Sequence, residues 1–333
     1  MHRVLHDRFA RPISYLRLSV TDRCDLRCHY CLPKGFRGFY EPAHWLDFDE
    51  LTRLAGLFAA HGVRHVRLTG GEPLLRRNLP ELVARLAALP GVERVSLSTN
   101  AVRLAKWAAA LKAAGLRRLN ISLDSLRPER YAAITGGGRL DKVLDGIEAA
   151  RAAGFRSVRI NMVVMRGIND DEVEDLLEFC LARGLLLRYI ETMPVGDTGR
   201  LAVRHHLPLD HVRARLARRY TLLPVLPAGA ARTAGPARYL RIAERGGARV
   251  GFITPLSDHF CADCNRVRLT ADGTLYPCLG DEHSVPLGRL LRAGADDAAL
   301  LEAVARALAA KPEGHRFNQN PERVIRFMSL TGG

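Results

Sequence analysis

The stretch YLRLSVTDRCDLRCHYCLP, residues 15–33, joins a run of alternating apolar and polar residues to three closely spaced cysteines, Cys24, Cys28 and Cys31. The alternation predicts a β-strand, so the cysteines follow the C-terminal end of that strand. The C-x3-C-x2-C spacing, with no fourth cysteine nearby, suits an iron–sulfur cluster held by three thiolates. Such a cluster leaves one iron open to a small molecule, as a catalytic zinc keeps an open position. A zinc ion with His29 as fourth ligand is the alternative that the spacing allows.

A helical segment that ends in glycine and leads into a β-type run recurs along the chain, with the glycines at Gly62, Gly91, Gly115, Gly154 and Gly184. Glycine just past a helix readily adopts the left-handed conformation. Alternating helices and strands predict parallel βαβ units. With the strand at 15–20 the count is six, so the predicted fold class is α/β, a partial (βα)6 TIM-type barrel. We expect the barrel to span residues 11–225 and a C-terminal domain to span residues 226–333.

The predicted strands have one apolar and one polar face. Leu16 and Leu18 alternate with Arg17 and Ser19, and the later strands repeat this pattern. A closed barrel fills its interior with branched apolar residues, so this pattern instead predicts a polar, cationic lumen. The alternative is an open sheet whose polar face meets solvent.

Short polar or glycine-bearing segments follow these strands: TGGEP at 69–73, STN at 98–100, SLDS at 122–125 and ETMP at 191–194. Ligands bind at the C-terminal ends of parallel strands in barrels and in open α/β sheets. We therefore expect these segments to surround the binding site.

A second set of cysteines, Cys261, Cys264 and Cys278, has the spacing C-x2-C-x13-C. A structural zinc completed by His259 or His283 is the alternative to a second three-cysteine cluster. The adjacent sequence NRVRL places two arginines, at 266 and 268, on one face of an extended segment. The seventh cysteine, Cys180, continues the apolar stripe of a helix and is expected in the core.

The composition is that of a globular protein, with 333 residues, 47% hydrophobic and 26% charged. The net charge of +15 comes from scattered basic residues, which favours an anionic small-molecule substrate over nucleic acid. No apolar run reaches the length of a bilayer, and no signal peptide is recognisable. We expect a cytoplasmic protein with no membrane or nucleic-acid partner.

Taken together, the cysteine triplet, TGGEPLLR, STN, NISLDS, RGIND, the late cysteines with NRVRL and the terminal diglycine resemble the GTP 3′,8-cyclases. These are radical S-adenosylmethionine (SAM) lyases that open molybdenum cofactor biosynthesis. The resemblance runs from about Arg11 to the end of the chain and is weakest between 195 and 250. The triplet is common to all radical SAM enzymes, whereas the late cysteines, the arginine pair and the diglycine are the narrower signature.

The resemblance implies the cofactors and the reaction. Two [4Fe–4S] clusters and SAM would convert GTP to 3′,8-cyclo-7,8-dihydroguanosine 5′-triphosphate. The metal ligands would be Cys24, Cys28 and Cys31 for the first cluster and Cys261, Cys264 and Cys278 for the second. It further assigns SAM contacts to Tyr30, Gly71, Ser122 and Met193. GTP contacts fall on Arg17, Arg67, Thr99, Arg159, Arg266 and Arg268, with Arg188 as a lumen neighbour, and a catalytic role falls on Gly332 and Gly333.

The chain departs from the family pattern at three positions: Arg159 replaces lysine, Ala101 replaces glycine and Thr331 replaces isoleucine. The resemblance also implies a one-electron donor and a next enzyme that takes the cyclic nucleotide, and it leaves a homodimer open. Two rival interpretations remain. One is a peptide-modifying radical SAM enzyme with an auxiliary cluster, and the other is a zinc-stabilised nucleic-acid-binding protein.

Overall fold

The computed structural model describes residues 4–225, 235–258 and 260–332. These residues form one curved sheet of twelve strands in the order β12-β11-β10-β1-β2-β3-β4-β5-β6-β9-β8-β7. The strands are β1 (Tyr15–Ser19), β2 (His65–Thr69), β3 (Arg94–Thr99), β4 (Arg118–Ser122), β5 (Val158–Val164), β6 (Leu186–Glu191), β7 (Leu222–Pro224), β8 (Arg238–Ile242), β9 (Arg249–Ile253), β10 (Arg266–Leu269), β11 (Thr274–Tyr276) and β12 (Val285–Pro286).

Strands β1 to β6 lie side by side in chain order and all pair in parallel, as the six βα units predict. Two later strands extend this parallel sheet, β10 next to β1 and β9 next to β6. The remaining strands are antiparallel additions at the two outer edges. The C-terminal part of the chain therefore completes both edges of the barrel sheet, which the sequence did not predict.

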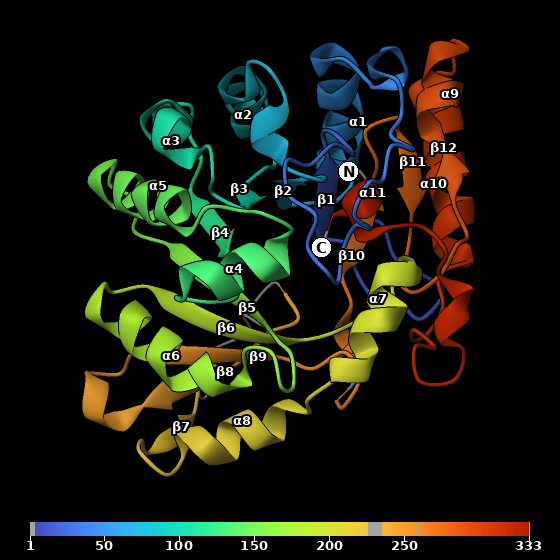
Figure 1. Cartoon of the computed structure of the whole chain (residues 1–333). Coiled ribbons are helices and arrows are strands. Elements are labelled where there is room, and N and C mark those ends of the chain that lie inside the picture. The colour runs from blue at the N-terminus through green and yellow to red at the C-terminus, as the bar shows by residue number, and fades with distance from the viewer. Residues whose placement is uncertain (1–3, 226–234, 259, 333) are drawn as a thin grey trace.

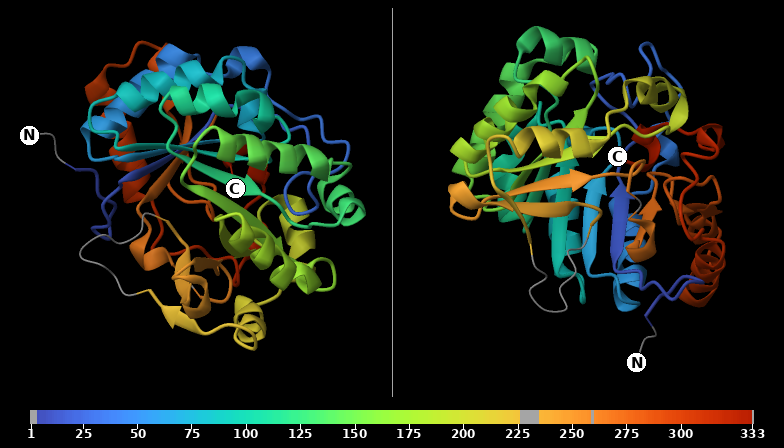
Figure 2. Two further views of the ribbon diagram at one scale, coloured as in Figure 1. Left: turned by 90° about the vertical axis from the view of Figure 1, so that its left-hand side faces the viewer. Right: turned by 90° about the horizontal axis from the view of Figure 1, so that it is seen from below.

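Most of the described α-helices cover the outer face of the curved sheet or its edges, whereas α11 (Met328–Thr331) lies inside the curve, against β1 (Figures 1 and 2). Besides α11, the described α-helices are α1 (Phe48–Ala60), α2 (Leu79–Ala88), α3 (Leu104–Ala113), α4 (Pro128–Thr135), α5 (Leu140–Ala152), α6 (Val173–Ala182), α7 (Gly196–Ala202), α8 (Leu209–Leu216), α9 (Leu287–Arg292) and α10 (Asp297–Ala309). None of the helices in the described ranges is long and apolar enough to cross a membrane.

Local sequence signals explain where these helices begin and end. The Asp47 side chain accepts a hydrogen bond from the backbone N–H of Glu50, and the Asp47 backbone N–H donates to the Glu50 side chain, which completes a capping box at the start of α1. The five glycines that follow helices all have positive φ, for example +103° at Gly62 and +65° at Gly184. These positions need the left-handed conformation, and glycine adopts it without steric cost.

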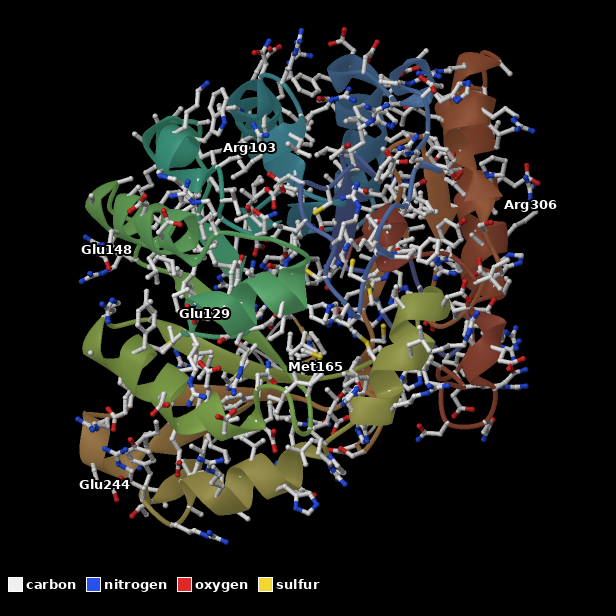
Figure 3. The ribbon with its side chains drawn as sticks, viewed as in Figure 1. Arg103, Glu129, Glu148, Met165, Glu244 and Arg306 are labelled. Carbon is white, nitrogen blue, oxygen red and sulfur yellow. The ribbon has the colours of Figure 1, made fainter. Side chains whose placement is uncertain are left out.

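The apolar faces of the strands pack under the helices. Leu16, Leu18, Leu119 and Ile121 are fully buried, as is Cys180, which confirms the core assignment of that thiol. Burial of these side chains is the main force that holds the helices on the sheet. The helices carry ion pairs on their outer faces, and the labelled Glu148 and Arg306 lie at the periphery of the molecule (Figure 3).

Candidate functional site

The first cysteine set lies in the loop that follows β1. The backbone N–H of Cys31 donates to the carbonyl of Cys28 over 2.9 Å, so a tight turn brings these two together. Burial raises the pKa of all three thiols, to about 12 for Cys31, and the proximity of Cys31 adds to the rise at Cys28. Buried thiols with raised pKa values need a nearby cation to become thiolates, and a metal centre supplies that charge. The donor set therefore fits a cluster.

The TGGEP segment packs directly against the backbone that leads into this set. The Gly71 N–H donates to the carbonyl of Thr21 over 2.9 Å, and the Glu72 N–H donates to that of Arg23 over 2.8 Å. A Cβ atom on Gly71 would lie 2.2 Å from the Arg23 carbonyl oxygen, which no side chain can tolerate. Glycine is thus required for the two loops to meet beside the cysteines.

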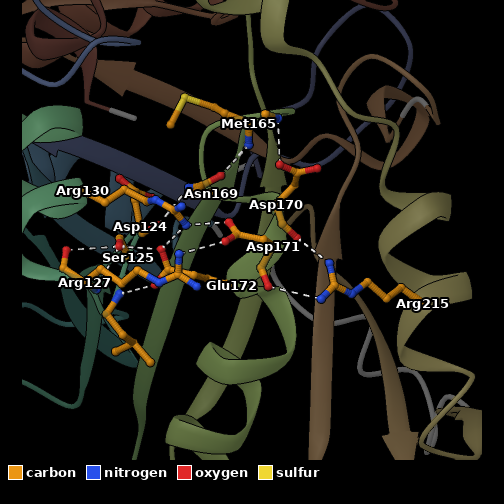
Figure 4. A network of polar contacts seen from close by, with 12 residues as sticks. Asp124, Ser125, Arg127, Arg130, Met165, Asn169, Asp170, Asp171, Glu172 and Arg215 are labelled. Atoms are coloured by element: carbon orange, nitrogen blue, oxygen red, sulfur yellow. Dashed lines mark hydrogen bonds and ion pairs between the residues drawn. The ribbon is translucent and has the colours of Figure 1, made fainter.

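Tyr30 points to the end of β4, where its hydroxyl donates to Asp124 over 2.6 Å. Asp124 also accepts the backbone N–H of Val163, and its carbonyl receives the side-chain amide of Asn169 over 2.8 Å. Asn169 belongs to the RGIND motif and in turn holds the backbone of Met165 (Figure 4). The RGIND motif therefore has a structural role, since it fixes the strand ends that position Tyr30.

Guanidinium groups line the inner face of the sheet. Arg17, Arg67 and Arg268 are at most 8% exposed, and Arg17 is level with the other two across β1, β2 and β10. Arg188 is 3% exposed and donates to the side-chain oxygens of Asn120 and Asn161. Within the described ranges the structure gives Arg67, Arg188 and Arg268 no ion pair with a carboxylate. A lumen of this kind predicts an anionic ligand.

The pKa values of these groups reflect the shared charge. Burial and then the neighbouring Arg268 and Arg67 lower the pKa of Arg17 well below its usual value. Burial, followed by Arg266 and Arg326, lowers the pKa of Arg268 to about 9. Like charges held at close range in a desolvated space are unfavourable, and a bound polyanion would relieve that repulsion. Arg159 is half-buried and lies 6.0 Å from the ring centroid of Tyr239.

The second cysteine set lines one pocket together with Met193, Arg266 and Arg268, and its other walls include Phe260, His315 and Phe317. Although burial alone would raise it, the charges of Arg266 and Lys311 lower the pKa of Cys264 to about 6. Burial raises the pKa of Cys261 and of Cys278. All three late cysteines line this one pocket, which fits a second cluster.

His283, one of the fourth ligands that the zinc alternative for the second set needs, is not among the described residues that line the pocket of that set. His29 and His283 are both exposed, and His259 lies outside the described residues. No three histidine, cysteine, aspartate or glutamate side chains in the described ranges are grouped to hold a single metal ion. A cluster instead spreads its cysteines over several irons.

The C-terminal segment reaches into the site. Helix α11 lies alongside β1 (Figure 1), and the backbone of Ser329 lowers the pKa of the Cys31 thiol, against the larger effect of burial, which raises it. The Gly332 carbonyl accepts a hydrogen bond from Arg268 over 3.2 Å. Gly332 has φ of +70°, and a Cβ atom there would lie 2.3 Å from the side chain of Thr69. Gly333 lies outside the described residues.

Thr99, Met193 and Ser122 occupy three different surroundings in the predicted site. The Thr99 hydroxyl donates to the buried Glu72 over 2.7 Å, so its donor is already used within the protein. Met193 packs in a small apolar cluster with Cys31 and also lines the second pocket, which places it between the two cysteine sets. Ser122 ends β4 and is half-buried.

Two of the departures from the family pattern have structural consequences. Ala101, in place of glycine, has φ of +63°, so the turn keeps a left-handed residue at the cost of strain at alanine. Thr331 is fully buried, and its hydroxyl has no hydrogen-bond partner among the described residues. An apolar side chain would fit that position without such a loss.

Sequence reasoning missed several residues that support the site, among them Asp124 and Lys311. Asp124 lies within the SLDS segment, whose position after a predicted strand is the signal that could have placed it beside Tyr30. Lys311 follows α10 without any motif or periodic signal, and its burial depends on tertiary contacts.

Comparison with known proteins agrees with this geometry. The Radical SAM superfamily model matches residues 18–180, and the Molybdenum Cofactor Synthesis C model matches residues 185–317. GTP 3′,8-cyclase 1 of Pseudomonas aeruginosa is 50% identical over 329 residues, 98% of both chains. The GTP 3′,8-cyclase of Bradyrhizobium diazoefficiens is 47% identical over 334 residues, 98% of this chain and 95% of the relative.

Solved structures support the fold alone, because their sequence identity is low. Streptococcus suis SuiB bound to S-adenosylmethionine has a TM-score of 0.59 at 16% identity and covers 87% of this chain and 68% of SuiB. SuiB bound to the precursor peptide SuiA has a TM-score of 0.63 at 15% identity and covers 96% and 76%. About half of the residues are identical to those of named relatives over nearly the full length of the chain, and both family models match it. The chain therefore belongs to the GTP 3′,8-cyclase family of radical SAM enzymes.

Proposed function

We propose that this protein is a GTP 3′,8-cyclase that converts GTP to 3′,8-cyclo-7,8-dihydroguanosine 5′-triphosphate, the first step of molybdenum cofactor biosynthesis. The observation that carries the proposal is a cationic lumen that lies between two sets of three cysteines. A triphosphate matches the buried guanidinium groups of Arg17, Arg67 and Arg268, because each can donate paired, charge-assisted hydrogen bonds to phosphate oxygens.

Cys24, Cys28 and Cys31 hold the first [4Fe–4S] cluster in this proposal. When bound, that cluster and SAM supply the one-electron cleavage that starts the radical reaction. The protein contributes position: Gly71 permits close approach of the TGGEP segment to the backbone of Arg23 beside the cysteines, and Asp124 fixes the Tyr30 ring. Ser122 and Met193 complete the SAM contacts, since they lie at or beyond strand ends on the same side of the barrel.

Cys261, Cys264 and Cys278 hold the second [4Fe–4S] cluster, beside Arg266 and Arg268. GTP then extends from this pocket along the lumen, with Arg159 and Thr99 as further contacts. Arg159 keeps the positive charge that lysine has in the family, but its planar group bonds phosphate with a different geometry.

The C-terminal segment closes the site in this proposal. Gly332 lies against Thr69 and Arg268, and a chain of such small residues occupies the lumen without displacing the substrate. Gly332 and Gly333 therefore act on the reacting complex by confining it and by excluding water.

The biological setting is proposed as well. A one-electron donor supplies the electron that reduces the first cluster, and the next enzyme of the pathway takes the cyclic nucleotide. The protein works in the cytoplasm, without a nucleic-acid or membrane partner, as a monomer or a homodimer. The division into a barrel at 11–225 and a C-terminal domain at 226–333 remains a prediction.

The test is anaerobic reconstitution followed by assays of iron, sulfide and zinc, and by incubation with GTP, SAM and a chemical reductant. We expect a brown protein with iron for two clusters that consumes GTP and forms the 3′,8-cyclic product. A colourless zinc protein whose main ligand is nucleic acid, with affinity that falls steeply with salt, would refute the proposal. Modification of a peptide instead of GTP would favour the rival radical SAM interpretation.

A further inference from the structure

Lys311 is buried beside the second cysteine set, where its orientation is fixed. The side chain is 1% exposed. Its Nζ atom lies 2.5 Å from the Arg266 carbonyl oxygen, 3.0 Å from the Pro277 carbonyl oxygen and 3.7 Å from the Cys264 sulfur. An ammonium group has three N–H donors, so these three acceptors account for all of them.

The sulfur atoms are the anionic partners available to this ammonium. A buried charge is costly unless an opposite charge accompanies it. Burial lowers the pKa of Lys311, thiolates at Cys264 and Cys278 oppose that shift, and Arg11 and Arg266 reinforce it. Among the described residues the structure gives no ion pair between Lys311 and a carboxylate. The thiolates of the second set therefore supply its counter-charge.

The charged groups that act on the thiols differ between the two cysteine sets. Carboxyl groups act on the first set, with Glu72 and Asp25 near Cys24 and Asp124 near Cys28. Cations act on the second set, where Arg266 and Lys311 both donate toward the Cys264 sulfur.

The reduction potential of an iron–sulfur cluster depends on the surrounding charge and on hydrogen bonds to its sulfurs. A fixed positive charge favours the state that carries one more electron. From these contacts we infer that Lys311 is a positioning residue that holds the Cys264 thiolate and raises the reduction potential of the second cluster above that of the first. This inference rests on the proposed function, in which the late cysteines bind a cluster.

The experiment compares variants that separate charge from hydrogen bonding. Lys311→Gln keeps two N–H donors for the carbonyl oxygens but removes the charge, whereas Lys311→Arg keeps the charge. Lys142→Gln is the matched control, because it removes the same charge from a position on α5 that is 46% exposed. Each full-length chain is reconstituted anaerobically and titrated redox-potentiometrically under electron paramagnetic resonance. Spectra with and without SAM distinguish the first cluster from the second.

We expect Lys311→Gln to lower the midpoint potential of the second cluster by the equivalent of about a tenfold change in its reduction equilibrium, or ~59 mV for one electron. The first cluster should not shift, and Lys311→Arg and Lys142→Gln should match the wild type. An unchanged potential in Lys311→Gln, or an equal shift in Lys311→Arg, would overturn the inference.

Cluster content keeps the test decisive if a variant binds iron poorly. Loss of the second cluster in Lys311→Gln but not in Lys311→Arg would support a need for the charge. Equal loss in both would overturn the inference, because shape alone would then explain it. A wild-type chain with iron for one cluster only would instead refute the second-cluster part of the proposed function.

Discussion

The Arg268 guanidinium donates a hydrogen bond to the carbonyl oxygen of Gly332, 64 positions later in the chain, over a distance of 3.2 Å. Arg268 is also one of the arginines that line the lumen and the second cysteine pocket. The end of the chain and the proposed substrate site therefore share one side chain. The position of the C-terminal segment and the binding of GTP are physically linked as a result.

Deletion of Gly332 and Gly333 should suppress cyclisation of GTP while both clusters and the fold remain. The physical reason is that Gly332 fills a space beside Thr69 and occupies Arg268, so its loss opens the lumen to water. The measurement is product formation together with iron content and a thermal unfolding curve. A C-terminal tag should act in the same direction.

Two further variants sharpen this test. Gly332→Ala should also suppress cyclisation, because its Cβ would meet the Thr69 side chain at 2.3 Å. A synthetic peptide that ends in MSLTGG should restore part of the activity of the deleted chain. Turnover at the wild-type rate in the deletion variant would show that the two terminal glycines are dispensable, as chain termini often are.

Arg268→Ala should weaken GTP binding by roughly ten- to a hundredfold, because hydrogen bonds to charged groups contribute about 1.5–3 kcal/mol each. SAM cleavage without GTP should barely change. Arg266→Ala is the informative partner, since it removes a neighbouring charge and leaves the contact between Arg268 and Gly332 in place. Equilibrium binding measures both. Unaltered GTP affinity in both variants would remove these arginines from the site.

The two cysteine sets should do separable work. Cys24→Ala should abolish reductive cleavage of SAM but leave a second cluster that still binds GTP. Cys278→Ser should keep some SAM cleavage that is no longer coupled to cyclisation. The assays are 5′-deoxyadenosine formation, GTP binding and iron content. If both variants merely unfolded and the wild type formed no 5′-deoxyadenosine, the assignment of the sets would be wrong.

Much of the barrel was predictable, because its signals are local. The post-helix glycines, the capping box at Asp47 and the alternation within the strands each depend on a few neighbouring residues. The same is true of the cysteine motifs, whose spacing already implies their chemistry. These features therefore predicted the six parallel strands and the cationic inner face.

The rest depends on contacts between distant segments. Strand β10 pairs with β1 at one edge of the barrel sheet, and β9 pairs with β6 at the other edge. Short strands that pair across long sequence separations leave little trace in sequence periodicity. Lys311 is an ordinary lysine in the sequence, and only its contacts with Arg266 and Cys264 reveal its role. Thr99 was predicted to contact GTP from the resemblance to the family. That resemblance does not reveal that the Thr99 hydroxyl donates to Glu72, which only the structure shows.

Arg11→Ala should destabilise the fold and weaken the second cluster more than the first. Arg11 forms a buried ion pair with Asp7 at 2.6 Å and donates to the carbonyl oxygens of Cys261, Pro312 and Glu313. It therefore ties the N-terminal segment to the loops of the second set. Its removal leaves the Asp7 carboxylate buried without its partner, which typically costs about 3–5 kcal/mol.

Chemical denaturation of the apo chain measures the first effect, and iron content after reconstitution measures the second. Arg8→Ala is the matched control, because Arg8 is exposed on the same segment and its contact is with the ring of Phe9. We expect Arg8→Ala to leave both the unfolding free energy and the iron content near the wild-type values. If Arg11→Ala took up both clusters fully and unfolded at the wild-type denaturant concentration, Arg11 would have no role in holding the second set, and the loop around Cys261 would be stable without the N-terminal segment.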